Sequence, residues 1–183
     1  MIVLFTEEAS MTPVLKRVMQ ATRPSAIEGV DWIIIAHRGK PDLHKNLVRK
    51  MREWNYGNPH FIILQDNDGG DCYHSKKKIL ELCTQTNKPY HVRIVCQELE
   101  SWFIGDLNAV EKAFPKSHAT KEARRPKFCN PDTLNKPSEI IAKLTDTGDS
   151  AKVGRAEVIS KFLALESNRS PSFQLLIATL RQL

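Results

Sequence analysis

The chain has 183 residues, of which 41% are hydrophobic and 26% charged, and its formal net charge is +6. These values are typical of a globular protein with one substantial core. No apolar run approaches the ~20 residues that a membrane span needs, and the N-terminal MIVLFTEEAS lacks the basic start of a signal peptide. The four cysteines form no C-x-x-C pair, which disfavours a zinc site or a disulfide framework. We therefore expect a cytoplasmic protein with reduced thiols and no membrane contact.

Apolar segments alternate with helical patterns in the first half of the chain. Buried strands are expected at residues 2–5, 32–36, 61–65 and 90–96. Helices are expected between them, beginning near Thr12, Pro41 and Ser75. The first three strands are nearly continuous apolar runs, which is typical of a parallel sheet covered by helices on both faces. The sequence thus predicts an α/β domain over residues 1–114, with the strand order left open.

The rest of the chain is expected to be helical. Residues 98–114, ELESWFIGDLNAVEKAF, have an amphipathic helical pattern. Residues 115–136 are rich in proline, lysine and arginine, which predicts a surface loop. Further helices are expected at residues 137–144, 151–165 and 172–183. We assign residues 115–183 to a basic loop and a helical C-terminal extension packed on the α/β domain.

Most of the excess positive charge lies in one stretch. The stretch from Lys112 to Lys136 contains seven basic and two acidic residues, so it carries +5 of the net +6. Lysine and arginine supply the salt-dependent part of nucleic-acid affinity, although a solubilising loop or a protein-docking surface fits the stretch equally. The candidate phosphate contacts, here and elsewhere, are Lys76, Lys77, Lys121, Arg124, Arg125, Lys127 and Lys152. For Lys76 and Lys77 the alternative is a solvated helix face.

Acidic residues follow three of the expected strands. They are Glu7 and Glu8 after the first strand, Asp66 and Asp68 after the third, and Glu98 and Glu100 after the fourth. Functional groups of parallel sheets collect at the carboxyl ends of the strands. Carboxylates gathered there raise one another's pKa unless a cation lies among them, and Mg²⁺, with Mn²⁺ as an alternative, takes such oxygen ligands. The sequence therefore predicts a divalent metal site at this edge.

Two alternatives qualify the metal site. The run DNDGGD also has the composition of an ordinary turn. Asp66 and Asp68 face the same side only if the strand geometry continues beyond the apolar residues. Glu98 and Glu100 fit helix capping and solvation as well as they fit metal binding.

The acidic motifs resemble those of the TOPRIM domain, which occurs in topoisomerases, bacterial primases and OLD-type nucleases. A strand ending in glutamate stands here as IVLFTEE, and a later strand ending in Asp-x-Asp stands as FIILQDND. More closely, QDNDGGDC, VCQELESWF and the C-terminal NRSPSFQLL resemble a TOPRIM-related family of formerly unknown function. That resemblance implies that Glu7 is the general acid/base and that Asp66 and Asp68 hold Mg²⁺. Glu8 departs from the glycine usual at that position, which leaves open which glutamate acts.

The resemblance implies a metal-dependent nuclease acting with an ATPase partner in bacterial defence. Tyr56, Tyr73 and Tyr90 lie in turns or at a strand start, which disfavours a topoisomerase, and the short chain disfavours a primase. Phosphodiester hydrolysis is the reaction class that remains. The alternative is a non-catalytic subunit that docks on the ATPase. DNA or RNA as substrate, and a homo-oligomer as the assembly, both stay open.

Overall fold

The computed structural model describes residues 1–183, except for the side chain of residue 149. In this described chain, four strands form one parallel sheet: β1 (Ile2–Thr6), β2 (Trp32–Ala36), β3 (His60–Asp66) and β4 (Tyr90–Val95). Their order is β2-β1-β3-β4, so β1 and β3 are neighbours at the centre. The predicted α/β fold is confirmed.

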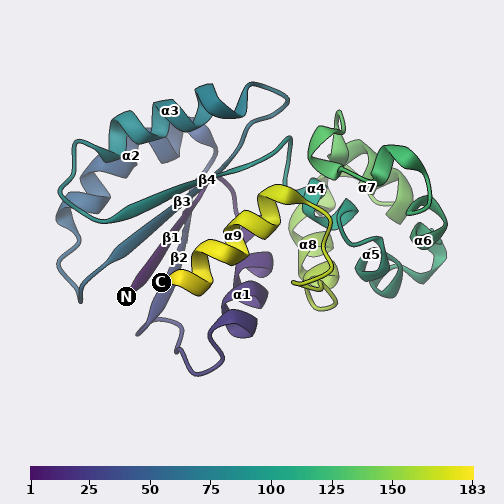
Figure 1. Ribbon diagram of the computed structural model, residues 1–183, viewed down its shortest axis with the longest axis horizontal. Helices are drawn as coiled ribbons and strands as arrows, with labels where there is room; N and C mark the ends of the chain where they lie inside the picture. The colour runs from purple at the N-terminus through teal and green to yellow at the C-terminus, as the bar shows by residue number, and fades with distance from the viewer.

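Helices cover both faces of the sheet (Figure 1). On one face lie α2 (Lys40–Glu53) and α3 (Cys72–Cys83); on the other lie α1 (Met11–Thr22) and the C-terminal α9 (Pro171–Gln182). Alternate residues of β1 lie on opposite faces of the sheet, because successive side chains of a strand point in opposite directions. Val3 and Phe5 pack in the cluster with α2 and α3, whereas Leu4 packs in the cluster with α1. This double burial explains the continuous apolar strands.

Two predicted helices have different bounds in the structure. The third begins at Cys72 rather than Ser75, because the Asp71 side chain accepts a hydrogen bond from the N–H of His74 (2.6 Å) and caps it. Lys76 and Lys77 therefore lie beyond its first turn. The predicted helix at 98–114 is two helices, α4 (Glu100–Ile104) and α5 (Leu107–Ala113), because Asp106 caps a new start by accepting from the N–H of Ala109.

The predicted basic loop consists largely of short helical turns. These are η1 (Pro115–Ser117), α6 (Ala119–Glu122), η2 (Pro126–Phe128) and η3 (Pro131–Thr133). Three of them begin at proline, whose fixed φ suits the first helical position. Buried Ala119 and Phe128 anchor the segment to the core, so sequence composition underestimated its order.

The remaining helices are α7 (Pro137–Thr145), η4 (Asp149–Ala151) and α8 (Lys152–Ser160). The helix predicted at 151–165 is thus shorter, and three apolar residues of that segment are exposed: Val153, Val158 and Phe162. Ser170 caps α9, accepting from the N–H of Phe173 (3.2 Å). None of the helices in the described chain is long and apolar enough to cross a membrane.

The helices α4 to α8 gather beside the carboxyl ends of the strands (Figure 1). One hydrophobic cluster joins them to the sheet, running from Leu4 and Ile62 through Trp102 to Ile141 and Ile159. The last helix, α9, returns to the sheet and packs against α1 and β4. The division at residue 114 stays a prediction, but the acidic edge of the sheet is covered by the helical half.

Candidate active site

The order of the strands brings Glu7 to Asp66. Thr6 of β1 pairs with Leu64 of β3, and the N–H of Glu7 continues that ladder by donating to the Leu64 carbonyl (3.2 Å). The Glu7 side chain then reaches across to β3, where its Oε2 accepts a hydrogen bond from the N–H of Asp66 (3.1 Å). The two sequence motifs therefore form one site at the centre of the sheet edge.

Asp66 is a buried carboxylate with an unused oxygen. Its side chain is the last of β3, and the residue is only 6% exposed. Oδ2 accepts a hydrogen bond from the N–H of Leu99 (3.3 Å), whereas Oδ1 has no partner among the described residues. Burial raises the pKa of Asp66 well above its ordinary value, and the charges of Glu7 and Glu8 raise it further. An ionised Asp66 therefore needs a cation at Oδ1.

Glu7 titrates near neutral pH. Burial is the main cause that raises its pKa from 4.5 to about 7, and the charge of Asp68 adds to the increase. The ammonium group of Lys40 opposes this rise. A carboxyl group with such a pKa is suited to both taking up and releasing a proton near pH 7.

Asp68 does not continue the strand. β3 ends at Asp66, and Asp68 has a left-handed backbone (φ 49°) followed by Gly69 at φ 76°. The Asn67 side chain closes this turn by donating to the carbonyl of Gly70 (2.6 Å). The strand alternation that would align Asp66 with Asp68 is therefore absent, because the turn composition of this run prevails.

Asp68 is instead paired with Lys40. Its Oδ2 lies 2.5 Å from the Lys40 Nζ at the first position of α2. The loop before α2 is held at the site, since the N–H of Gly39 donates to the carbonyl of Glu7 (2.9 Å). Sequence reasoning missed Lys40. The signal was the run HRGKP directly after β2, at the same carboxyl edge of the sheet.

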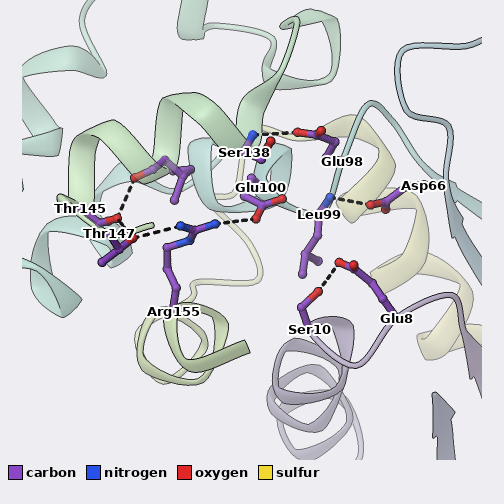
Figure 2. Close-up of polar contacts among 11 residues, drawn as sticks. Glu8, Ser10, Asp66, Glu98, Leu99, Glu100, Ser138, Thr145, Thr147 and Arg155 are labelled. Carbon is purple, nitrogen blue, oxygen red and sulfur yellow. Dashed lines mark hydrogen bonds and ion pairs between the residues drawn. The ribbon is translucent and has the colours of Figure 1, made fainter. Parts of the chain in front are cut away.

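Glu8 lies on the α1 side of the site. Its carboxylate accepts a hydrogen bond from the hydroxyl of Ser10, and its carbonyl accepts one from Thr6 Oγ1 (3.0 Å). Figure 2 shows Glu8 beside Asp66, with Glu8 bonded to Ser10 and Asp66 bonded to the N–H of Leu99. Both glutamates after β1 thus lie at the site, but Glu7 makes the direct contact with β3.

Glu98 and Glu100 both bond to helices of the helical half. Glu98 Oε2 accepts a hydrogen bond from the N–H of Ser138 (2.8 Å), in the first turn of α7. Glu100 is 3% exposed and forms an ion pair with Arg155 of α8, Oε1 to Nη2 3.0 Å (Figure 2). Burial raises the pKa of Glu100, and the Arg155 contact opposes that rise. The two glutamates fasten the helical half to the acidic edge, and their role as ligands stays a prediction.

Lys152 faces the acidic edge from the first position of α8. Burial alone would lower its pKa, but the negative charges of Glu100 and Glu8 raise the pKa overall. The helical half thus contributes a cation beside the buried carboxylates. Sequence analysis named Lys152 but did not identify Arg155, whose burial depends on its partner across the fold.

The other basic candidates lie away from this edge. Lys77, Lys121 and Arg124 are exposed. Lys76 lines a cavity of about 300 Å³ beside Cys72. Arg125 and Lys127 line a cavity of about 600 Å³ in the helical half. The predicted basic surface is therefore divided between different faces.

The carboxylates at this edge supply only part of the ligand shell of a divalent ion. Among the described residues, no group of three His, Cys, Asp or Glu side chains is arranged to hold a metal. Glu7 contacts the backbone of Asp66, whereas the Asp68 carboxylate pairs with Lys40. Metal binding by Glu7, Asp66, Asp68, Glu98 and Glu100 stays a prediction. Mg²⁺, however, often takes one or two carboxylates and completes its shell with waters and substrate phosphates. Glu7 and the unused Oδ1 of Asp66 fit that requirement.

The chain matches, over residues 5–181, the family described as Domain of unknown function (DUF4276). It belongs to this DUF4276 family. Among solved structures, its fold is similar to the C-terminal region of the Burkholderia pseudomallei OLD protein, with a TM-score of 0.60. That match covers 99% of this chain and 97% of the other at 15% sequence identity, so it shows a shared fold. The comparison with curated proteins gives no match.

Proposed function

We propose that this DUF4276 protein is a metal-dependent nuclease that hydrolyses nucleic-acid phosphodiester bonds. The contact between Glu7 and the end of β3, beside the unused Oδ1 of Asp66, carries the proposal. The likeness in fold to a region of an OLD protein agrees with the resemblance of the two acidic motifs to TOPRIM domains. In phosphodiester hydrolysis a water attacks the phosphorus and the P–O bond to the leaving oxygen breaks; charge neutralisation at the phosphate and proton transfer at the water or the leaving oxygen assist both events.

Each residue has a distinct role in this proposal. Asp66 and Glu7 would hold Mg²⁺, which supplies positive charge to the scissile phosphate. Glu7 also moves a proton at the nucleophile or at the leaving oxygen. Lys152 contacts the phosphate from the helical half and stabilises the charge that develops there.

Lys40 and Asp68 act as a pair. Lys40 lowers the pKa of Glu7, whereas Asp68 raises it. Their ion pair therefore adjusts the protonation of Glu7 without itself contacting the reacting atoms. A phosphate that approached Asp68 would compete for Lys40, which would free Asp68 to join the metal ligands.

The wider role follows from the sequence resemblance. We infer that the protein is the effector of an ATPase-coupled bacterial defence system, since the TOPRIM-related family that its motifs resemble implies such a partner. A nuclease with an open acidic site would harm its host, so we expect the partner to restrain it. Cleavage of cellular nucleic acid by the isolated protein without any trigger would contradict that restraint.

A second candidate function is a non-catalytic subunit that docks on the ATPase. The observation that favours it is the pairing of acidic groups within the protein: Asp68 with Lys40, and Glu100 with Arg155. In that case the acidic edge would serve structure or regulation, and metal would neither bind nor matter.

A cleavage assay with Asp66→Asn separates the two functions. Labelled single- and double-stranded DNA and RNA are incubated with Mg²⁺ or Mn²⁺, and Asp71→Asn is the matched control because Asp71 only caps α3. The nuclease requires loss of cleavage in the first variant alone. Equal cleavage by the two variants would sink the proposal, as would a wild-type protein with no thermal stabilisation by millimolar Mn²⁺.

A further inference from the structure

A basic cavity lies in the helical half, between η1, η2 and α7. It has a volume of about 600 Å³ and adjoins a second hollow of about 550 Å³ that shares Lys116 and Leu144 with it. Its cationic lining residues are Lys116, Arg125, Lys127 and Lys143. Its apolar lining includes Ile140 and Leu144. Cavities of this size hold organic ligands, and this one combines apolar walls with a cationic rim.

The cavity lining carries a net charge of +2, because its four cations outnumber two carboxylates, Glu122 and Asp146. Arg125 is paired with Glu122 at 2.9 Å. Within the described part of the chain, Lys116, Lys127 and Lys143 form no ion pair. Asp146 is a further carboxylate in the lining. The rim therefore favours an anion.

One rim cation is held in place by an aromatic ring. The Lys127 Nζ lies 4.7 Å from the centroid of Phe128, whose side chain is buried in the core. This cation–π contact restrains an exposed ammonium group at the mouth of the cavity. A partly ordered ammonium loses less entropy when it binds a phosphate.

The helix α7 connects the basic cavity to the proposed active site. At its N-terminal end, Ser138 bonds to Glu98, and Lys136 and Pro137 line a cavity of about 300 Å³ together with Asp68. At its C-terminal end, Leu144 lines the basic cavity. Nine helical residues span about 14 Å, and a stacked strand advances about 3.4 Å per nucleotide, so α7 matches about four nucleotides.

We propose that the basic cavity is a second binding site for the substrate strand, which holds single-stranded nucleic acid about four nucleotides from the site of cleavage. The phosphates contact Lys116 and Lys143, and a base rests against Ile140 and Leu144. The strand then follows α7 to the acidic edge. This inference rests on the proposed nuclease function and names the form of its substrate.

Binding measured without metal tests the inference separately from cleavage. The probe is a fluorescent single strand of about 12 nucleotides, three times the α7 span, in DNA and RNA forms of one sequence, with EDTA present. The variant is Lys116→Glu with Lys143→Glu. The matched control is Lys45→Glu with Lys78→Glu, an equal charge change at exposed positions of α2 and α3.

Anisotropy should show about tenfold weaker binding for the cavity variant, with the control near wild type. The slope of log affinity against log salt should fall by about 1.4, because each lost phosphate contact on a single strand removes about 0.7. Thermal unfolding verifies that both variants fold. The strand that binds with higher affinity, DNA or RNA, shows which sugar the site prefers.

Other results would overturn the inference. An equal loss in both variants would show a diffuse charge effect, and a wild-type protein that bound neither strand would leave the cavity without this ligand. A mononucleotide that bound as tightly as the long strand would exclude contacts along α7. The proposed function fails differently, through unchanged cleavage by Asp66→Asn, whatever the strand binding shows.

Discussion

The N–H of Asp66 donates a hydrogen bond to Oε2 of Glu7 at 3.1 Å, which joins the end of β3 to the end of β1. The donor and acceptor are 59 residues apart in the chain. The bond therefore holds two acidic side chains together where burial opposes the ionisation of both.

Asp66→Asn should stabilise the metal-free protein at alkaline pH. Ionised Asp66 is buried with one oxygen unpaired, and a buried polar group without a partner lowers the stability of the fold by about 1–3 kcal/mol. Thermal unfolding in EDTA should show the gain at about pH 8 and its loss as the pH falls below the ordinary value of 3.8, where Asp66 is protonated in both the folded and the unfolded state. The variant should also lose the stabilisation that Mn²⁺ gives the wild type. A wild type less stable than the variant in saturating Mn²⁺ would contradict the metal assignment.

Glu7→Gln should remove part of the pH dependence of stability. The folded pKa of about 7 exceeds the ordinary 4.5, so between these values the folded protein holds more protons than the unfolded chain. Wild-type stability should therefore fall as pH rises from 4.5 to about 7, by about 1–2 kcal/mol after allowance for solvent screening of this half-buried group. Chemical denaturation at several pH values in EDTA measures it. A variant with the same slope as the wild type would show that another group titrates.

Lys40→Ala should shift the pH profile of cleavage to higher pH while changing stability little. Lys40 lowers the pKa of Glu7, so its removal raises that pKa. The ion pair with Asp68 is partly exposed and contributes about 0–1 kcal/mol to folding. Rates from about pH 6 to 9 measure the shift, with Lys45→Ala as the control on the same helix. An unchanged pH profile would show that Lys40 does not influence the proton transfer.

Glu100→Gln should destabilise the fold strongly. The ion pair between Glu100 and Arg155 is buried, and loss of one partner leaves the other charge unpaired at a cost of about 3–5 kcal/mol. The double variant Glu100→Leu with Arg155→Met should be more stable than the sum of the single changes predicts. Denaturant unfolding of the wild type, Glu100→Leu, Arg155→Met and the double variant completes the cycle. Simple additivity would mean that the pair contributes no coupling between α4 and α8.

The strand pattern and the acidic motifs were predictable from local sequence. Continuous apolar runs such as FIIL at 61–64 can be buried only on both faces of a sheet, and the helices between them specify parallel strands. The carboxylates after β1, β3 and β4 were visible because parallel strands end at a common edge.

Contacts between distant segments were decided by the tertiary structure. The order β2-β1-β3-β4 places Glu7 beside Asp66, and no local pattern encodes which strands are neighbours. The pairing of Asp68 with Lys40, and of Glu100 with Arg155, requires side chains that are 28 and 55 residues apart. Burial is likewise a property of the whole fold, so the pKa of Glu7 and the unused oxygen of Asp66 follow only once the helical half covers the sheet edge. Local sequence set the chemistry available at this edge, and packing set which groups remain free to act.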